Sequence, residues 1–166
     1  CADSYPYKAI SVFALHPIYI DLNEWSDLPL FEKYREQGEK LNALPQLDYE
    51  RTFSLKSAFL HELHALRGKE ISASEAYSDF VRKNSSWLEP YVTFCNKRDK
   101  YGTADFRSWP PVKVSTEIES DYYTFVQFLL FSQLSAVHKY ATEKGVLLKG
   151  DIPIGVSRDS ATAWHA

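Results

Sequence analysis

The sequence predicts a mostly α fold with a few parallel β strands, and three observations lead to this prediction. Apolar residues recur at helical spacing over most of the chain. Near the C-terminus, the apolar residues 122–141 lead to Gly145 and then at once to the apolar run Val146–Lys149. A helix, a glycine stop and an apolar strand form the second half of a βα unit, whose strand joins a parallel sheet. Only one other segment, Ala9–Leu22, has the β-branched and aromatic composition of a strand, so the sheet is incomplete within these residues.

The first predicted elements are a strand and two helices. Pro17 interrupts the strand within residues 9–22, because proline cannot donate a hydrogen bond to a strand ladder. Residues 28–68 carry apolar side chains at helical spacing on either side of Pro45, which predicts two helices. The second of these helices is predicted to end at Gly68, since glycine is favoured just past a helix C-terminus.

Two capping boxes predict two further helices in the middle of the chain. In residues 72–75 and again in residues 86–89, a serine is followed three positions later by a glutamate. Pro90 fits the first turn of the second of these helices, which should end at Gly102. The following residues 103–119 contain a Trp-Pro-Pro sequence and are predicted to form a connection.

The last long helix is predicted to lie in the core. Residues 122–141 are apolar on nearly every helical face, and the exceptions are Gln127, Gln133 and His138. A helix that is apolar all round is buried rather than amphipathic. We therefore expect neighbours on every side of it.

The composition excludes several classes of protein. The 166 residues carry 19 Lys and Arg against 22 Asp and Glu, a net charge of −3, and 45% of them are hydrophobic. Scattered basic residues argue against nucleic acid and anionic membranes as partners, and no apolar run reaches the roughly 20 residues of a membrane span. Two cysteines, Cys1 and Cys95, cannot form a disulfide framework, which favours a cytoplasmic location. The absence of methionine, even at the first position, predicts that the chain is part of a longer protein.

Three groups of residues are candidates for a site. Asp151 follows the predicted strand, and polar side chains at the carboxyl ends of parallel strands line active faces, although a turn-forming role fits its position equally well. Asp159 and Ser160 precede a short predicted helix, where a helix N-cap is favoured over a functional role on local grounds. Tyr7 belongs to a rigid Tyr-Pro-Tyr turn whose rings could bind a sugar, although buried core tyrosines are commoner.

No metal or cofactor site is expected. His61 and His64 are three positions apart, whereas the metalloprotease motif needs a spacing of four, and no third ligand is evident. A solvated helix surface is therefore the better interpretation of these histidines. Cys95 is predicted to be a small buried hydrophobic residue. The sequence contains neither a Gly-rich phosphate loop nor a G-x-S-x-G nucleophile turn, which argues against nucleotide-binding and serine-hydrolase functions.

The two ends of the chain together resemble a known family. Residues 150–156 (GDIPIGV), Asp159-Ser160-Ala161 and Trp164 resemble the GDLPI…DSA…W signature of glycoside hydrolase family 77, the 4-α-glucanotransferases or amylomaltases. At the N-terminus, residues 3–7 (DSYPY), 11–14 (SVFA) and 17–22 (PIYIDL) are similar to the family's DSPY…S.FA.NP.YIDL segment. Further family motifs resemble residues 87–94, Trp109-Pro110 and residues 125–145. These matches occur in the family's order and cover most of the chain.

Two departures from the family pattern resemble its longer branch, which the plant cytosolic disproportionating enzyme typifies. Tyr5 is an extra residue before the Pro-Tyr pair, and His16 stands where the family has asparagine before Pro17. The resemblance therefore points to this branch.

The resemblance implies a partial (β/α)8 TIM-barrel fragment with a helical insertion subdomain. Residues 1–22 would form an early barrel strand and a substrate loop, and residues 23–119 the helical insertion subdomain. Residues 120–166 would form a barrel helix, a strand and the following loop on the active face. The remainder of the parent barrel would then be the structural partner of this chain.

The resemblance also implies an enzyme that transfers α-1,4-glucan segments between maltooligosaccharides by a retaining double displacement, without a cofactor. The family's nucleophile (R.D) and acid (EDLG) motifs do not occur in their context here, so the catalytic carboxylates are expected outside this chain. Tyr7 and Asp151 match positions beside the sugar at the cleavage site. Asp159, Ser160 and Trp164 match signature positions that we expect to support the glucan cleft. The alternatives are a non-catalytic helical module that binds glucan or a partner protein, and a helical domain with coincidental barrel-like ends.

Overall fold

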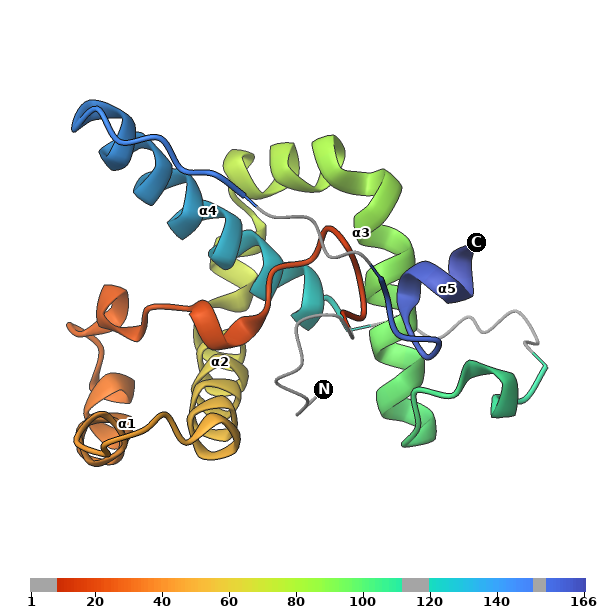
Figure 1. The fold of residues 1–166 in the computed structure, drawn as a ribbon, viewed down its shortest axis with the longest axis horizontal. Helices are drawn as coiled ribbons and strands as arrows, with labels where there is room; N and C mark the ends of the chain where they lie inside the picture. Colours follow the sequence, from red (N-terminus) through yellow and green to blue (C-terminus); the bar gives the residue numbers. More distant parts are fainter. Residues whose placement is uncertain (1–8, 112–119, 151–154) are drawn as a thin grey trace.

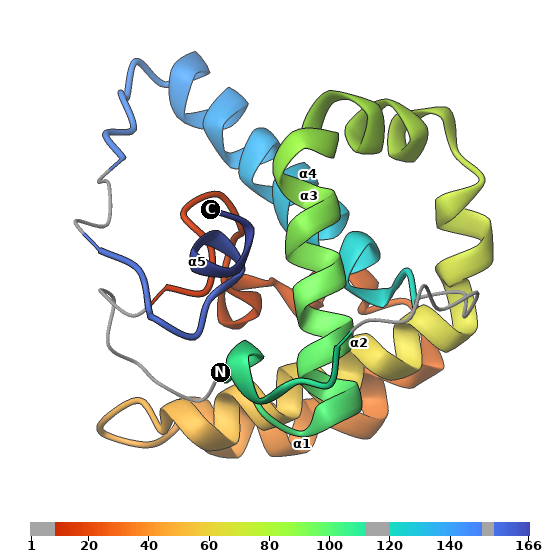
Figure 2. The ribbon, with the colours of Figure 1, turned by 90° about the vertical axis from the view of Figure 1, so that its right-hand side faces the viewer.

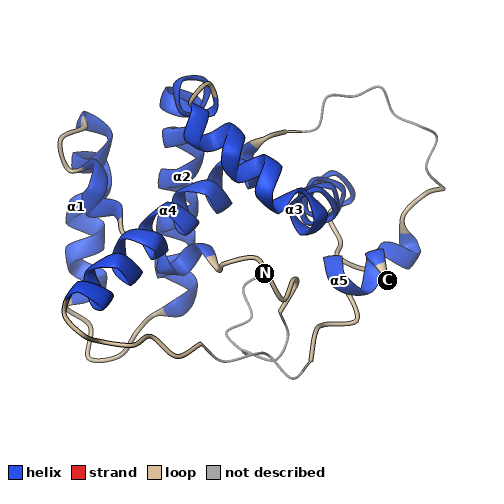
Figure 3. Ribbon diagram, turned by 90° about the horizontal axis from the view of Figure 1, so that it is seen from above, coloured by secondary structure: helices blue, strands red, loops and turns tan. Residues whose placement is uncertain are grey.

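The computed structural model describes residues 9–111, 120–150 and 155–166 of the chain (Figure 1). The regular elements of this part are all helices, as Figure 3 shows. They are the α-helices α1 (Pro29–Asn42), α2 (Tyr49–Ser72), α3 (Glu75–Tyr101), α4 (Tyr122–Glu143) and α5 (Ala161–His165), and the short 3-10 helices η1 (Pro17–Tyr19), η2 (Leu22–Trp25) and η3 (Phe106–Ser108). Among these helices, none combines the length and the apolar character that a membrane span requires.

The prediction of parallel strands, and with it of a partial (β/α)8 TIM-barrel fragment, is wrong for the residues that the structure describes. These residues contain helices and loops but no strand and no sheet. One isolated parallel bridge is present in the described residues, between Ala9 and Val156, and Val156 lies outside the predicted strand Val146–Lys149.

The two predicted strands fail for different physical reasons. Residues 9–22 turn through η1, and side chains rather than another strand satisfy part of their backbone. For example, the Gln127 carboxamide pairs with Leu15. The run Val146–Leu148 takes part in no bridge between described residues, and Leu147 is 93% exposed. An apolar run alone does not reveal whether a neighbouring strand exists.

Helix α4 is buried mainly along its first half, with Ala141 the one buried residue near its end, which corrects the expectation of a helix buried all round. Phe125 and Leu130 lie in the core, whereas Val137 and Tyr140 are exposed. Figure 1 shows the end of α4, in blue, projecting away from the other helices. Helices α2, α3 and η1 pack against α4, and its buried residues other than Ala141 lie between Tyr122 and Leu130.

The helix pair predicted around Pro45 is confirmed by α1 and α2. The predicted end of the second helix at Gly68 is wrong, because α2 continues to Ser72. Gly68 instead packs under His64: a Cβ atom at this position would lie 2.8 Å from His64 Cδ2. This glycine marks a close contact inside a helix rather than a helix end.

Alanine is expected to act in opposite directions at two helical glycines. At Gly38 in α1, a new Cβ would meet nothing within 4 Å, so Gly38→Ala should stabilise the fold by about 0.5–1 kcal/mol through helix propensity. At Gly68 the Cβ would displace the ring of His64, whose Nε2 lies 2.8 Å from Asp121 Oδ1. Gly68→Ala should therefore lower the free energy of unfolding by about 1 kcal/mol. Urea denaturation measures both changes, and stabilisation by Gly68→Ala would contradict the packing role.

Helix α3 replaces the two helices that the capping boxes predict. It is continuous from Glu75 to Tyr101, and its N-cap is Ser74, whose Oγ accepts from the Tyr77 N–H at 3.2 Å. Pro90 lies inside this helix, where its ring and its missing N–H favour a bend. Figures 1 and 2 show α3 bent sharply about midway. The predicted end at Gly102 is confirmed, with φ at 68°.

The core consists of two apolar clusters. The first joins α1, α2 and α4 around Phe59 and Phe125, and Ile20 from the N-terminal segment inserts into it. The second lies on α3 around Phe94 and includes Ala161 from α5. Both ends of the described chain are therefore anchored on the helices.

Candidate functional site

Three of the predicted site residues lie in the described part of the chain. Asp159, Ser160 and Trp164 belong to the C-terminal segment, residues 155–166, whose helix α5 packs against α3. Tyr7 and Asp151 lie outside the described residues, so their roles stay predictions.

The C-terminal segment lies beside the N-terminal segment. Ala9 and Val156 form a parallel bridge, and the Ser157 N–H donates to the Ala9 carbonyl at 3.1 Å. The Ala161 N–H donates to the Ile10 carbonyl at 2.8 Å. Figure 2 shows α5 next to the N-terminal segment, drawn in red. Backbone hydrogen bonds thus join the two segments that carry the family signatures at opposite ends of the chain.

Ser160 caps helix α5. Its Oγ accepts from the Ala163 N–H at 3.0 Å, and the residue is fully buried. The sequence predicted a helix cap at the pair Asp159 and Ser160, and Ser160 is the residue that forms it. This cap starts the helix that presents Trp164 to α3.

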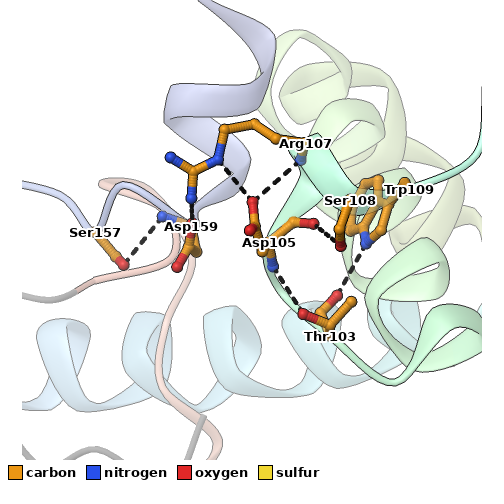
Figure 4. A network of polar contacts seen from close by, with 7 residues as sticks. All are labelled: Thr103, Asp105, Arg107, Ser108, Trp109, Ser157 and Asp159. Carbon is orange, nitrogen blue, oxygen red and sulfur yellow. Dashed lines mark hydrogen bonds and ion pairs between the residues drawn. The ribbon is translucent and has the colours of Figure 1, made fainter.

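Asp159 is held by an arginine that the sequence analysis did not single out. Arg107 Nη2 lies 2.9 Å from Asp159 Oδ1, and Arg107 Nε lies 2.6 Å from Asp105 Oδ1 (Figure 4). The hydrogen bond to Asp105 raises the pKa of the Arg107 guanidinium and lowers the pKa of the Asp105 carboxyl group. Arg107 and Asp159 are 52 positions apart, and nothing local to Arg107 marks this pairing. The ion pair between Arg107 and Asp159 joins the loop that follows α3 to the C-terminal segment, and the pair with Asp105 lies within the loop.

Trp164 lies in an aromatic cluster on α3 and the following loop. Its ring centroid lies 6.2 Å from that of Phe94 and 6.1 Å from that of Trp109, and Lys97 Nζ lies 4.9 Å from the Trp164 centroid. The Trp109 Nε1–H donates to the Thr103 carbonyl at 2.9 Å, which orients the neighbouring ring. Trp164 is half-buried and packs as part of this cluster. The described signature residues therefore fix the path of the C-terminal segment.

No metal centre is found within the described ranges, where no group of three or more His, Cys, Asp or Glu could hold an ion. His61 stacks on Tyr122 with ring centroids 3.9 Å apart, and His64 contacts Asp121, so the histidines join α2 to the start of α4. His61 is exposed, as the solvated-surface interpretation predicts, whereas His64 is half-buried between α2 and the start of α4, which corrects that interpretation for His64. Burial raises the pKa of the Cys95 thiol to about 11, and the prediction of a small buried hydrophobic residue is confirmed.

The sequence as a whole matches a known family. Residues 1–166 match the profile of glycoside hydrolase family 77, described as 4-alpha-glucanotransferase. The chain belongs to this family of 4-alpha-glucanotransferases. The family resemblance of the terminal motifs is thereby confirmed. No solved structure gives a significant match.

Several 4-alpha-glucanotransferases are similar to the chain. The rice protein 4-alpha-glucanotransferase DPE2 (Oryza sativa subsp. japonica) is 33% identical, and the match covers 98% of this chain and 19% of the rice protein. The 4-alpha-glucanotransferase of Chlamydia muridarum is 30% identical, over 97% of this chain and 33% of the relative. That of Thermus thermophilus is 31% identical, over 96% of this chain and 34% of the relative. The chain thus spans about a fifth to a third of the length of these relatives.

Proposed function

We propose that the full-length protein is a 4-alpha-glucanotransferase that transfers α-1,4-glucan segments between maltooligosaccharides with retention of configuration. The observation that carries the proposal is the family match over residues 1–166. In a retaining mechanism, a carboxylate nucleophile forms a glycosyl-enzyme and a second carboxyl group acts as acid and then as base. A sugar hydroxyl replaces water as the acceptor, and no cofactor is needed. We assign both carboxylates to residues outside the printed sequence, because neither family motif occurs in it.

Tyr7 and Asp151 are the proposed substrate-binding residues. The bridge between Ala9 and Val156 supports a shared location, because Tyr7 precedes Ala9 by two positions and Asp151 precedes Val156 by five. Tyr7 offers an apolar ring face to the sugar. Asp151 offers hydrogen bonds that strengthen as the sugar flattens toward an oxocarbenium-like transition state.

Asp159, Ser160 and Trp164 are proposed to support the loop next to the glucan cleft. The ion pair of Asp159 with Arg107 and the helix cap of Ser160 favour a role in holding the segment that begins at Gly155. Trp164 contributes through its packing on α3. We also propose a cytoplasmic location, with which the free buried thiol of Cys95 agrees.

Incubation with maltotriose tests the proposed function. The full-length protein should produce glucose together with maltooligosaccharides longer than maltotriose. The 166-residue chain alone should produce neither, because it lacks the proposed nucleophile and acid. Robust glucose release by the purified chain would mean that the catalytic carboxylates lie within it. Binding of maltoheptaose by the full-length protein without any transfer would favour the alternative of a non-catalytic helical module.

A further inference from the structure

Two glutamine side chains of α4 each pair with the backbone of one residue in the N-terminal segment. Gln127 Oε1 accepts from the Leu15 N–H at 2.9 Å, and Gln127 Nε2 donates to the Leu15 carbonyl at 2.9 Å. In the same way, Gln133 Oε1 accepts from the Asp21 N–H at 2.8 Å, and Gln133 Nε2 donates to the Asp21 carbonyl at 2.9 Å. A carboxamide side chain carries both the donor and the acceptor that this arrangement needs. The pattern copies the two hydrogen bonds that a directly opposed pair of residues exchanges in an antiparallel sheet.

The residues between these two contacts are held from α2. Lys56 Nζ donates to the carbonyls of Ile18 and Ile20 at 2.6 Å and 2.7 Å. The Ile20 side chain is fully buried in the first apolar cluster. A shift of the N-terminal segment by one residue would break the glutamine hydrogen bonds and withdraw Ile20 from the core. The contacts therefore fix the register of this segment.

Packing alone does not explain a glutamine at position 127. The side chain is fully buried among apolar residues, where methionine would occupy a similar volume without a polar group. With methionine, however, the N–H and the carbonyl of Leu15, a half-buried residue, would lose their hydrogen bonds to Gln127. A backbone group that is shielded from water and has no partner is costly. The specific contribution of Gln127 is thus to hold the backbone of Leu15 in place.

We infer that Gln127 and Gln133 are positioning residues, a glutamine clamp that sets the place of Tyr7 through the register of the N-terminal segment. The described backbone runs without a gap from the clamped Leu15 to Ala9, which is bridged to Val156, and Tyr7 precedes Ala9 by two positions. The inference rests on the proposed function, because the role of Tyr7 is to contact the glucan.

A double-mutant cycle in the full-length protein tests this inference. Gln127→Met should lower kcat/KM for maltotriose about 10-fold, the size of effect that a small misplacement of a substrate-binding group produces. The kinetics are measured at a temperature at which the melting curve of each variant shows a folded protein. If Gln127 acts through Tyr7, the double variant Gln127→Met with Tyr7→Ala loses no more than Tyr7→Ala alone. Losses that multiply in the double variant would overturn the inference.

Amide hydrogen exchange tests the clamp independently of activity. Gln127→Met should speed the exchange of the Leu15 amide about 10-fold, and Gln133→Met should do the same for the Asp21 amide. The matched control is Gln37→Met, at an exposed position of α1, which should leave both amides unchanged. Unchanged exchange in the clamp variants would overturn the inference even in an active enzyme. Faster exchange in a protein that transfers no glucan would refute the proposed function while the clamp itself stands.

Discussion

The Asp151→Asn variant of the full-length protein is expected to turn over maltotriose about 100-fold more slowly than the unchanged protein, with a much smaller change in KM. The physical reason is that a carboxylate makes charge-assisted hydrogen bonds to the sugar, and these tighten as positive charge develops in the transition state. The neutral amide of asparagine cannot follow this change. Steady-state kinetics with maltotriose, together with a melting curve, measure the effect.

Two further variants serve as comparisons for Asp151→Asn. Asp27→Asn removes a carboxylate at an exposed position after η2 and should leave kcat unchanged. Tyr7→Ala should weaken binding and rate together, because the proposed contact of its ring with the sugar would be present before and during the reaction. An Asp151→Asn enzyme with a normal kcat and a lowered Tm would show that Asp151 forms a turn and does not act on the substrate.

Phe94→Ala is expected to cause the largest loss of stability among the substitutions considered, about 3–5 kcal/mol. Phe94 is fully buried, and its ring lies 5.3 Å from that of Trp109 and 6.2 Å from that of Trp164. Its removal would leave a cavity beneath the C-terminal segment. Urea denaturation followed by near-UV circular dichroism measures the free energy of unfolding and the order of the tryptophan rings.

Leu66→Ala is the matched control for this substitution. Leu66 lies on α2 and is 59% exposed, so its truncation should change the free energy of unfolding by no more than about 0.5 kcal/mol. A loss below about 1 kcal/mol for Phe94→Ala would contradict the assignment of this residue to a closely packed cluster.

Local sequence signals predicted helices well and their ends less well. The helical spacing on either side of Pro45 led to α1 and α2, and Gly102 ended α3 as predicted. Gly68 resembled a helix end because glycine is common there, yet a contact with His64 explains it. The capping box at residues 86–89 was overridden by packing, since α3 continues through Pro90 with a bend. A local pattern cannot weigh the tertiary contacts that decide such cases.

The predicted strands failed because a strand depends on a partner that a local pattern does not contain. The N-terminal segment finds its backbone partners in Gln127, Gln133 and Lys56. The sequence showed the two glutamines only as polar exceptions in an apolar helix, and no local pattern singled out Lys56. The pairing of Arg107 with Asp159 could not be predicted either, because the two residues are distant in sequence. The family motifs located the signature residues, whereas their contacts required the three-dimensional structure.

The most direct test of the central claim, that Tyr7 and Asp151 act on one sugar, is a crystal structure of the full-length protein with a bound maltooligosaccharide. We predict that the ring of Tyr7 packs against a glucosyl unit and that the Asp151 carboxylate lies within about 3 Å of the hydroxyl groups of the same unit. The pairing of Ala9 with Val156 should be retained in this complex. A maltooligosaccharide that contacts neither residue, or that places them on different sugars, would contradict the claim.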